Sequence, residues 1–127
     1  MSAQRKQRPA PEDPILAVIA AHKAAYVAHG LAIERSEARG LNKRLSAEAE
    51  RAVIQASKEA DRIATDLLRI TPTTSGGLYA LIEYAVMHDS SGTEWPPEEE
   101  DSEGIPRSWC FRLLQNVLKA MRHGVAL

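Results

Sequence analysis

Apolar side chains recur at helical spacing from the first structured residues of the chain. Asp13 followed by Pro14 predicts a helix start, because the carboxylate can accept first-turn amides and proline there loses no hydrogen bond. Gly40 and Asn42 predict the end of this first helix. Its stripe, at steps of four and three, comprises Ile15, Ile19, His22, Tyr26, His29 and Ile33.

A second long helix is predicted after Ser46, which suits the N-cap position. Its seam keeps steps of four and three throughout and predicts close packing against another helix. Both helices are roughly 35–40 Å long at about 1.5 Å per residue, and a short loop at 40–45 joins them into an antiparallel hairpin. The seam comprises Ala49, Val53, Ala56, Ala60, Ile63, Leu67 and Ile70.

Two shorter helices are predicted to complete the fold. Pro72 ends the second helix, and a third begins within 75–77 and runs to about His88 with Glu83 as its only charged residue, so it should be mostly buried. A last helix begins near Pro106 or Ser108 and continues to Arg122. We therefore predict an all-α protein: a long antiparallel helical hairpin with two shorter packed helices, like a four-helix bundle.

Two segments without periodicity are present, one before the first helix and one between the third helix and the last. Residues 1–12 are predicted to be a disordered basic arm, leaving 13–127 as a single helical domain. A flexible acidic loop is predicted at 89–105, where residues 89–104 hold seven acids and no basic residue. In this loop Trp95, Pro96 and Pro97 either form a docking peptide or simply anchor the loop to the domain.

Composition narrows the function classes. The 127 residues include 44% hydrophobic but only 5% aromatic residues, and much of the apolar content is alanine, which favours closely spaced helices over a sheet. The net charge of −1 does not indicate a polyanionic partner or a membrane surface. Cys110 is the only cysteine, and its apolar neighbours predict a small buried hydrophobe. We expect a cytoplasmic protein with no membrane span.

Candidate chemistry centres on the histidines. His22 and His29 share a helix face two turns apart, which favours packing or interface roles, because that separation is too long for one metal without ligands from another helix. A metal site completed by Glu59 or Asp66 is the remote alternative. The carboxylates lie at exposed positions, and no phosphate-loop lysine follows the glycines of the third helix. We predict no catalytic site, no cofactor and no enzyme.

Nucleic-acid binding is the main alternative function. The helix at 75–88 carries no Lys or Arg, so it lacks the donors that read bases and anchor phosphates. A small nucleic-acid-associated regulator would instead rely on basic residues at the amino-terminal arm and the hairpin end. These are Arg5, Lys6, Arg8, Lys43 and Arg44.

The sequence also resembles a group of small helical proteins common in alphaproteobacterial genomes, which has no assigned activity. The resemblance is carried by the residues at 13–16, 22–26, 67–82 and 84–88, and its most distinctive part is the ProThrThr-x-x-Gly turn at 72–77. It implies a bacterial, cytoplasmic, uncharacterised protein and transfers no catalytic residue.

The function predicted from these patterns is non-enzymatic interaction or structural support. The seams of the long helices are longer than a fifteen-residue helix of roughly 22 Å can cover, so apolar surface remains for another protein or, more simply, a second copy. We therefore predict a homodimer. The predicted interface comprises Tyr26, Ile33, Val53, Ala56, Ala60 and Ile63.

Overall fold

The computed structural model describes residues 12–38, 43–90 and 98–127. They form four helices and one short antiparallel strand pair, which confirms the predicted all-α architecture. The elements are α1 (Pro14–Ala38), α2 (Lys43–Arg69), α3 (Ser75–Ser90), β1 (Glu99–Glu100), β2 (Pro106–Arg107) and α4 (Trp109–Arg122).

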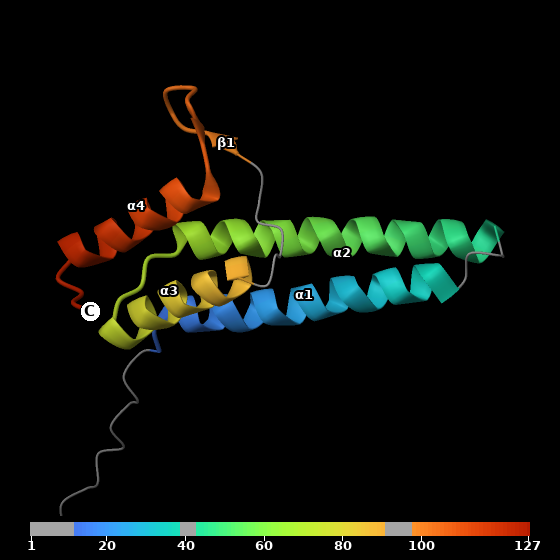
Figure 1. Ribbon diagram of the computed structural model, residues 1–127, viewed down its shortest axis with the longest axis horizontal. Helices are drawn as coiled ribbons and strands as arrows, with labels where there is room; N and C mark the ends of the chain where they lie inside the picture. The colour runs from blue at the N-terminus through green and yellow to red at the C-terminus, as the bar shows by residue number, and fades with distance from the viewer. Residues whose placement is uncertain (1–11, 39–42, 91–97) are drawn as a thin grey trace, which may run out of the picture.

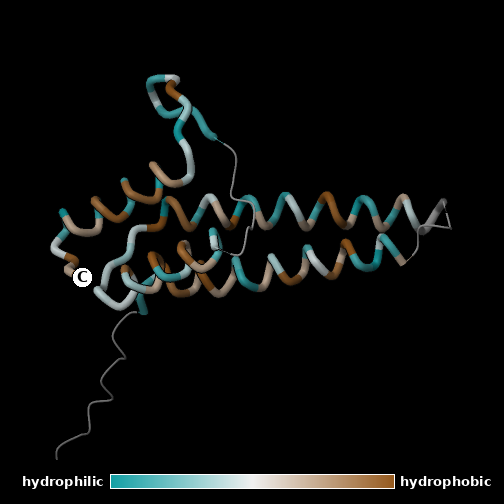
Figure 2. Tube along the Cα trace, viewed as in Figure 1, coloured by the Kyte–Doolittle hydropathy of each residue, from teal (hydrophilic) through white to brown (hydrophobic). Residues whose placement is uncertain are grey.

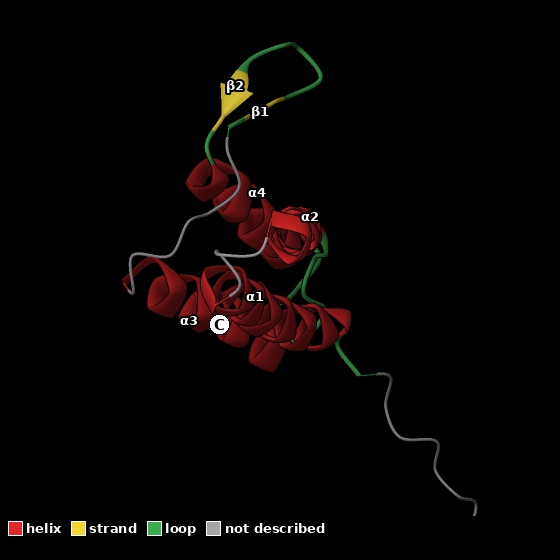
Figure 3. Cartoon of the chain, turned by 90° about the vertical axis from the view of Figure 1, so that its right-hand side faces the viewer, coloured by secondary structure: helices red, strands yellow, loops and turns green. Residues whose placement is uncertain are grey.

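The two long helices lie antiparallel along their full length, and the short helices gather at one end of them (Figure 1). At that end, α3 packs beside α1 and α4 packs beside α2, as the rotated view also shows (Figure 3). The opposite half of the hairpin has neither short helix beside it (Figure 1). The core therefore lies at the crowded end and comprises Ile15, Ile19, Leu67, Leu68, Leu81, Tyr84, Ala85 and Leu113.

The carboxylate of Asp13 joins the start of α1 to the connection between α2 and α3. One oxygen, Oδ1, accepts the amide of Ile15 at 3.2 Å, which confirms the predicted N-cap. The other, Oδ2, accepts the amides of Thr73 and Thr74 at 3.0 and 2.9 Å and the Thr74 hydroxyl at 2.7 Å. The Thr74 hydroxyl oxygen in turn accepts the amide of Gly77, so α3 is capped by the same network.

Burial acts to raise the pKa of Asp13, but these hydrogen bonds outweigh it. The bond from the Thr74 hydroxyl and the bonds from the amides of Ile15, Thr73 and Thr74 favour the ionised form and hold the pKa below its ordinary value. Asp13 is only 3% exposed, so loss of its charge would weaken all four of these hydrogen bonds at a buried position.

Gly77 leaves the space that Asp13 occupies. A Cβ atom at Gly77 would overlap the Asp13 carboxylate and stand 3.0 Å from Cγ2 of Ile15. At the neighbouring Gly76, a Cβ would meet no atom within 4 Å. Packing against Asp13 therefore requires glycine at position 77 but not at position 76.

The last helix is fixed to α2 by a buried side-chain amide. Asn116 is 4% exposed, and its amide nitrogen donates to the carbonyls of Leu67 and Ile70 at 3.4 and 2.8 Å. Its oxygen accepts the hydroxyl of Thr71 at 2.7 Å. Leu67 lies in the last turn of α2 and Ile70 directly follows it, where carbonyls lack partners within the helix, so Asn116 supplies a C-terminal cap from another helix.

The structure corrects two local predictions. The second helix begins at Lys43, so Ser46 lies inside its first turns and is not the N-cap. Cys110 is exposed, although Leu113, one turn further along α4, is buried. By contrast, the last helix begins near the predicted positions Pro106 or Ser108: Ser108 is the N-cap of α4 and accepts the amide of Phe111.

Part of the predicted acidic loop is ordered by a carboxylate turn. Asp101 accepts the amides of Glu103 and Ile105 at 2.9 and 3.0 Å and the guanidinium of Arg107 at 2.9 Å. The flanking strands pair Glu99 with Arg107. The two-stranded hairpin was not expected, because its strands are two residues long and have no periodic signal.

The two glycines provide a matched test of the Asp13 network. We predict that Gly77→Ala lowers the free energy of unfolding by about 2 kcal/mol, because the new methyl group displaces the carboxylate from its donors. Gly76→Ala should raise it by about 0.5 kcal/mol, because alanine costs less backbone entropy in a helix. Urea unfolding followed by circular dichroism measures both. Equal effects of the two substitutions would contradict this account of Asp13.

Candidate functional site

Two histidines and two tyrosines meet where α1 faces α3. His22 and Tyr26 lie one turn apart on α1, and Tyr84 and His88 lie one turn apart on α3, so each pair projects from one helix face. Nδ1 of His22 is 2.5 Å from the hydroxyl oxygen of Tyr84, and the two share a buried hydrogen bond. The His22 and His88 rings are 5.0 Å apart between centroids and nearly perpendicular.

The remaining ring contacts extend this cluster to the surface. Tyr26 meets His88 edge-on with centroids 5.6 Å apart, and Tyr84 stacks on His88 at 5.7 Å. The ammonium of Lys23 lies 5.5 Å from the centre of the Tyr84 ring. His22, Tyr84 and His88 are buried, whereas Tyr26 is 48% exposed, so the cluster has one solvent-facing edge.

Burial keeps the hydrogen-bonded pair neutral. Burial and, to a smaller extent, the electrostatic influence of His88 together lower the pKa of His22 to about 4. Burial, with a smaller contribution from Tyr26, raises the pKa of Tyr84 above its ordinary value. At neutral pH the pair is therefore an imidazole and a phenol, a suitable arrangement for packing and for presenting ring faces.

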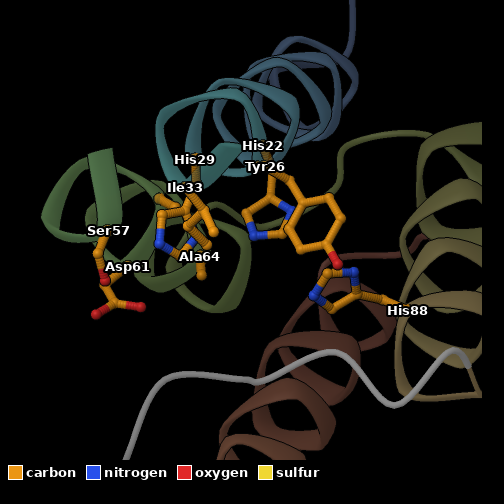
Figure 4. Close-up of a pocket in the computed structure, with 10 residues that line it drawn as sticks. His22, Tyr26, His29, Ile33, Ser57, Asp61, Ala64 and His88 are labelled. Carbon is orange, nitrogen blue, oxygen red and sulfur yellow. The ribbon is translucent and has the colours of Figure 1, made fainter. Parts of the chain in front are cut away.

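A pocket of about 350 Å³ opens beside the cluster, alongside the last turns of α3 (Figure 4). Gly30, Ala60 and Ala64 are among its lining residues, and their short side chains leave the space open. In the close-up, His22, Tyr26 and His88 stand on one side, and Ser57 and Asp61 stand on the other. We call this the histidine pocket; its lining comprises His22, Tyr26, His29, Gly30, Ile33, Ser57, Ala60, Asp61, Ala64 and His88.

A second hollow of about 310 Å³ lies between α3 and α4. Its lining is mainly apolar, with Asp89 and Ser90 at the end of α3. The exposed Cys110 belongs to this hollow, and the exposed side chains of Val86 and Leu114 contribute to it. The hollow is open because α3 and α4 share few direct contacts.

The outward side of α1 is a third unusual surface. Ala20, Ala24, Val27 and Leu31 are all exposed and follow steps of four, three and four, so they share one face of the helix. Val27 is 60% exposed and Leu31 is 45% exposed. We call these four residues the outer stripe. Hydrophobic segments recur along α1, including the part beyond α3 (Figure 2).

Among the described residues, α1 is the one helix long and apolar enough to cross a membrane by length and composition. Only 28% of its most apolar stretch is buried. Core helices of soluble proteins pass the same test but are mostly buried, so the exposure of α1 is its distinctive property.

The structure places the predicted interface residues at positions that differ in burial. Ile63 is 8% exposed and lies in the core of the single chain, while Val53, Ala56 and Ala60 are half-buried. Tyr26 and Ile33 are exposed and line the histidine pocket together with Ala60.

The residues of the remote metal-site alternative do not converge. In the parts of the chain that the structure describes, no group of three or more His, Cys, Asp or Glu side chains is placed to hold a metal ion. Glu59 and Asp66 instead form ion pairs with Arg62, at 2.5 and 3.5 Å.

For several residues with a predicted role, the structure does not describe the residue or does not describe its side chain. Residues Trp95, Pro96 and Pro97 of the docking loop, and Arg5, Lys6 and Arg8 of the basic arm, fall in the segments that the structure does not describe. Lys43 and Arg44 belong to the first turn of α2, where only the backbone is described.

Sequence reasoning missed Tyr84 and His88 as partners of His22. The signal was present as two aromatic pairs at a spacing of four, His22 with Tyr26 and Tyr84 with His88. What the spacing could not supply was the register of α3 against α1, which brings the two pairs together.

Comparison of the chain with protein-family models, with curated proteins and with solved structures yields no match. The resemblance noted from the sequence therefore stays a prediction, and the functional argument depends on the geometry of the chain itself.

The neutral state of His22 predicts a pH dependence of stability. Between the folded pKa of about 4 and the ordinary value of 6.5, the unfolded chain binds a proton at His22 that the folded chain does not. The free energy of unfolding should therefore fall by about 2–3 kcal/mol as pH is lowered from 7 to 4.5. Asp13 contributes little to this change, because its lowered pKa makes its stabilisation fade only below about pH 4.

His22→Gln isolates that contribution. We expect the variant to be less stable than the wild type at pH 7. Because it lacks the titrating imidazole, its free energy of unfolding should fall less with decreasing pH, so the two curves of unfolding free energy against pH converge towards pH 4.5. Urea unfolding at half-unit pH intervals measures both curves. Parallel curves would show that His22 is not held neutral in the folded protein.

Proposed function

We propose that this protein is a non-enzymatic helical interaction protein that associates with a second copy of itself through the outer stripe of α1. As part of this proposal it works in the cytoplasm, where the exposed Cys110 stays reduced.

The observation that carries the proposal is the mismatch between the composition of α1 and its burial. Of its 25 residues only four are buried. Apolar residues occupy every side of the helix, so packing on α2 and α3 leaves hydrophobic surface in water. A contiguous exposed apolar surface of this kind marks an interaction site.

The outer stripe is self-complementary, which favours a second copy as its partner. If two α1 helices pair antiparallel about a two-fold axis between residues 25 and 26, Leu31 faces Ala20 and Val27 faces Ala24. A larger side chain then meets an alanine in every pair. The two alanines allow the helix axes to approach to about 8 Å, the close end of the usual range.

A membrane is a poorer partner for the same surface. α1 packs along α2, and α2 exposes charged residues at intervals along its length, including Arg51, Lys58 and Arg62. Insertion of α1 across a bilayer would either separate the two helices or carry these charges into lipid, at a cost of several kcal/mol. Lys23 also lies within the apolar stretch of α1, and Glu34, Arg35 and Glu37 lie near its end.

Leu31→Lys tests the proposed interface. We predict that the wild-type protein has about twice the mass of its 13.9 kDa chain in light scattering. The substitution places a charge against Ala20 of each partner and should weaken the dimer about 100-fold, so the mass falls towards that of one chain at micromolar concentration.

Tyr79→Lys is the matched control, because Tyr79 is a large exposed side chain on α3, 61% exposed against 45% for Leu31, and lies away from the outer stripe. It should leave the dimer intact. A monomeric wild type, or equal dissociation by both variants, would refute the interface. If the wild type is a monomer that sediments with lipid vesicles and the Leu31→Lys variant does not sediment with them, the outer stripe binds a membrane surface and not a second copy.

A further inference from the structure

We propose that the histidine pocket binds a small organic cation with a flat aromatic body, such as an arylalkylamine. The inference comes from three properties of its walls: one uncompensated carboxylate, several ring faces and a size suited to a small molecule.

The carboxylate belongs to Asp61. It is the one acidic residue in the lining, and it forms no salt bridge with any residue in 12–38, 43–90 or 98–127. The neighbouring Arg62 is paired with Glu59 and Asp66, and a further hollow of the surface is lined by Asp61 together with Lys58 and Arg62. Asp61 therefore gives its side of the histidine pocket a negative charge that a bound ammonium group would neutralise.

The opposite wall is aromatic. His22, Tyr26 and His88 present rings from α1 and α3, with Tyr26 at the solvent-facing edge (Figure 4). Because burial keeps His22 uncharged at neutral pH, that wall does not repel a cation through His22. Ring faces attract cations and also stack on flat apolar groups, so the wall suits both parts of an arylalkylamine.

The volume limits the occupant to a small molecule. A pocket of about 350 Å³ is near the lower end of the range that holds small ligands. Gly30, Ala60 and Ala64 contribute only short side chains to it, so one ring system fits against the helices. The hydroxyl of Ser57, one turn before Asp61 on α2, adds a hydrogen-bonding group on the charged side.

This inference is independent of the proposed dimer. None of the four residues of the outer stripe lines the histidine pocket, so the two surfaces occupy different faces of α1. A monomeric protein could bind the amine, and a dimer could fail to bind it.

Tryptamine and its neutral analogue tryptophol provide a matched pair of probes, because they differ in an ammonium group against a hydroxyl. Titration of the full chain is followed by nuclear magnetic resonance, using the side-chain signals of His22, Tyr26 and His88. We expect saturable shifts with tryptamine and at least fivefold weaker binding of tryptophol, in line with the loss of one ion pair and one cation–π contact.

Asp61→Asn should weaken tryptamine about fivefold and leave tryptophol unchanged, since only the charge is removed. Glu50→Gln is the control: Glu50 is an exposed acid on the same helix and does not line the pocket, so its replacement should alter neither probe. Both positions are exposed, and thermal unfolding confirms that the variants fold.

Three outcomes would overturn the proposal. Absence of saturable shifts up to 10 mM tryptamine, a concentration well above the weak end of specific small-molecule binding at about 1 mM, would exclude the site. Equal affinity for the two probes would show that the pocket does not select a cation. Equal losses in Asp61→Asn and Glu50→Gln would show that only the general charge of the protein attracts the amine.

Discussion

The carboxylate of Asp13 is the contact on which the rest of the structure depends. It caps α1 with one oxygen and binds the connection from α2 to α3 with the other, so the starts of α1 and α3 meet at one buried charge. The cost of burying that charge is offset by four donors in total, three of them backbone amides. Gly77 completes the arrangement by leaving room for the carboxylate.

Fixing those ends sets the register of α3 along α1. That register brings Tyr84 and His88 against His22 and Tyr26, and it places the histidine pocket alongside the last turns of α3. It also confines α3 to one half of the hairpin, so among the helices that the structure describes α2 is the main neighbour of the remaining half of α1. The two proposed binding surfaces are therefore consequences of the same constraint.

Much of this fold is predictable from periodicity and capping rules. The helices at Asp13 and Ser108 begin where a short polar side chain precedes an apolar run, and the hairpin follows from two long regular seams. The capping role of Asp13 was therefore visible, but its bonds to Thr73 and Thr74 were not. Local patterns do not show that one carboxylate serves segments sixty residues apart.

The candidate site was less predictable for the same reason. His22 was paired with His29 because they share a helix face, yet the contacts that define its environment come from Tyr84 and His88 on another helix. Cys110 was expected to be buried because its neighbours are apolar, but α4 buries Leu113 and Asn116 and leaves Cys110 exposed at the hollow between α3 and α4. Exposure is decided by helix rotation, which local composition does not determine.

The central functional claim is that two copies pair antiparallel through α1, and distances between spin labels test it most directly. Labels are attached in turn to Ala28→Cys and Arg35→Cys, each in a Cys110→Ser background; both positions flank the outer stripe. With the proposed two-fold axis, residues 28 lie about 8 Å apart along the helix axis and residues 35 about 28 Å apart.

Pulsed dipolar spectroscopy should therefore report a separation below about 20 Å for the first label and about 30 Å or more for the second, once helix spacing and label length are added. Short separations for both labels would indicate parallel pairing. Absence of any dipolar coupling would contradict the claim that α1 joins two copies of the chain.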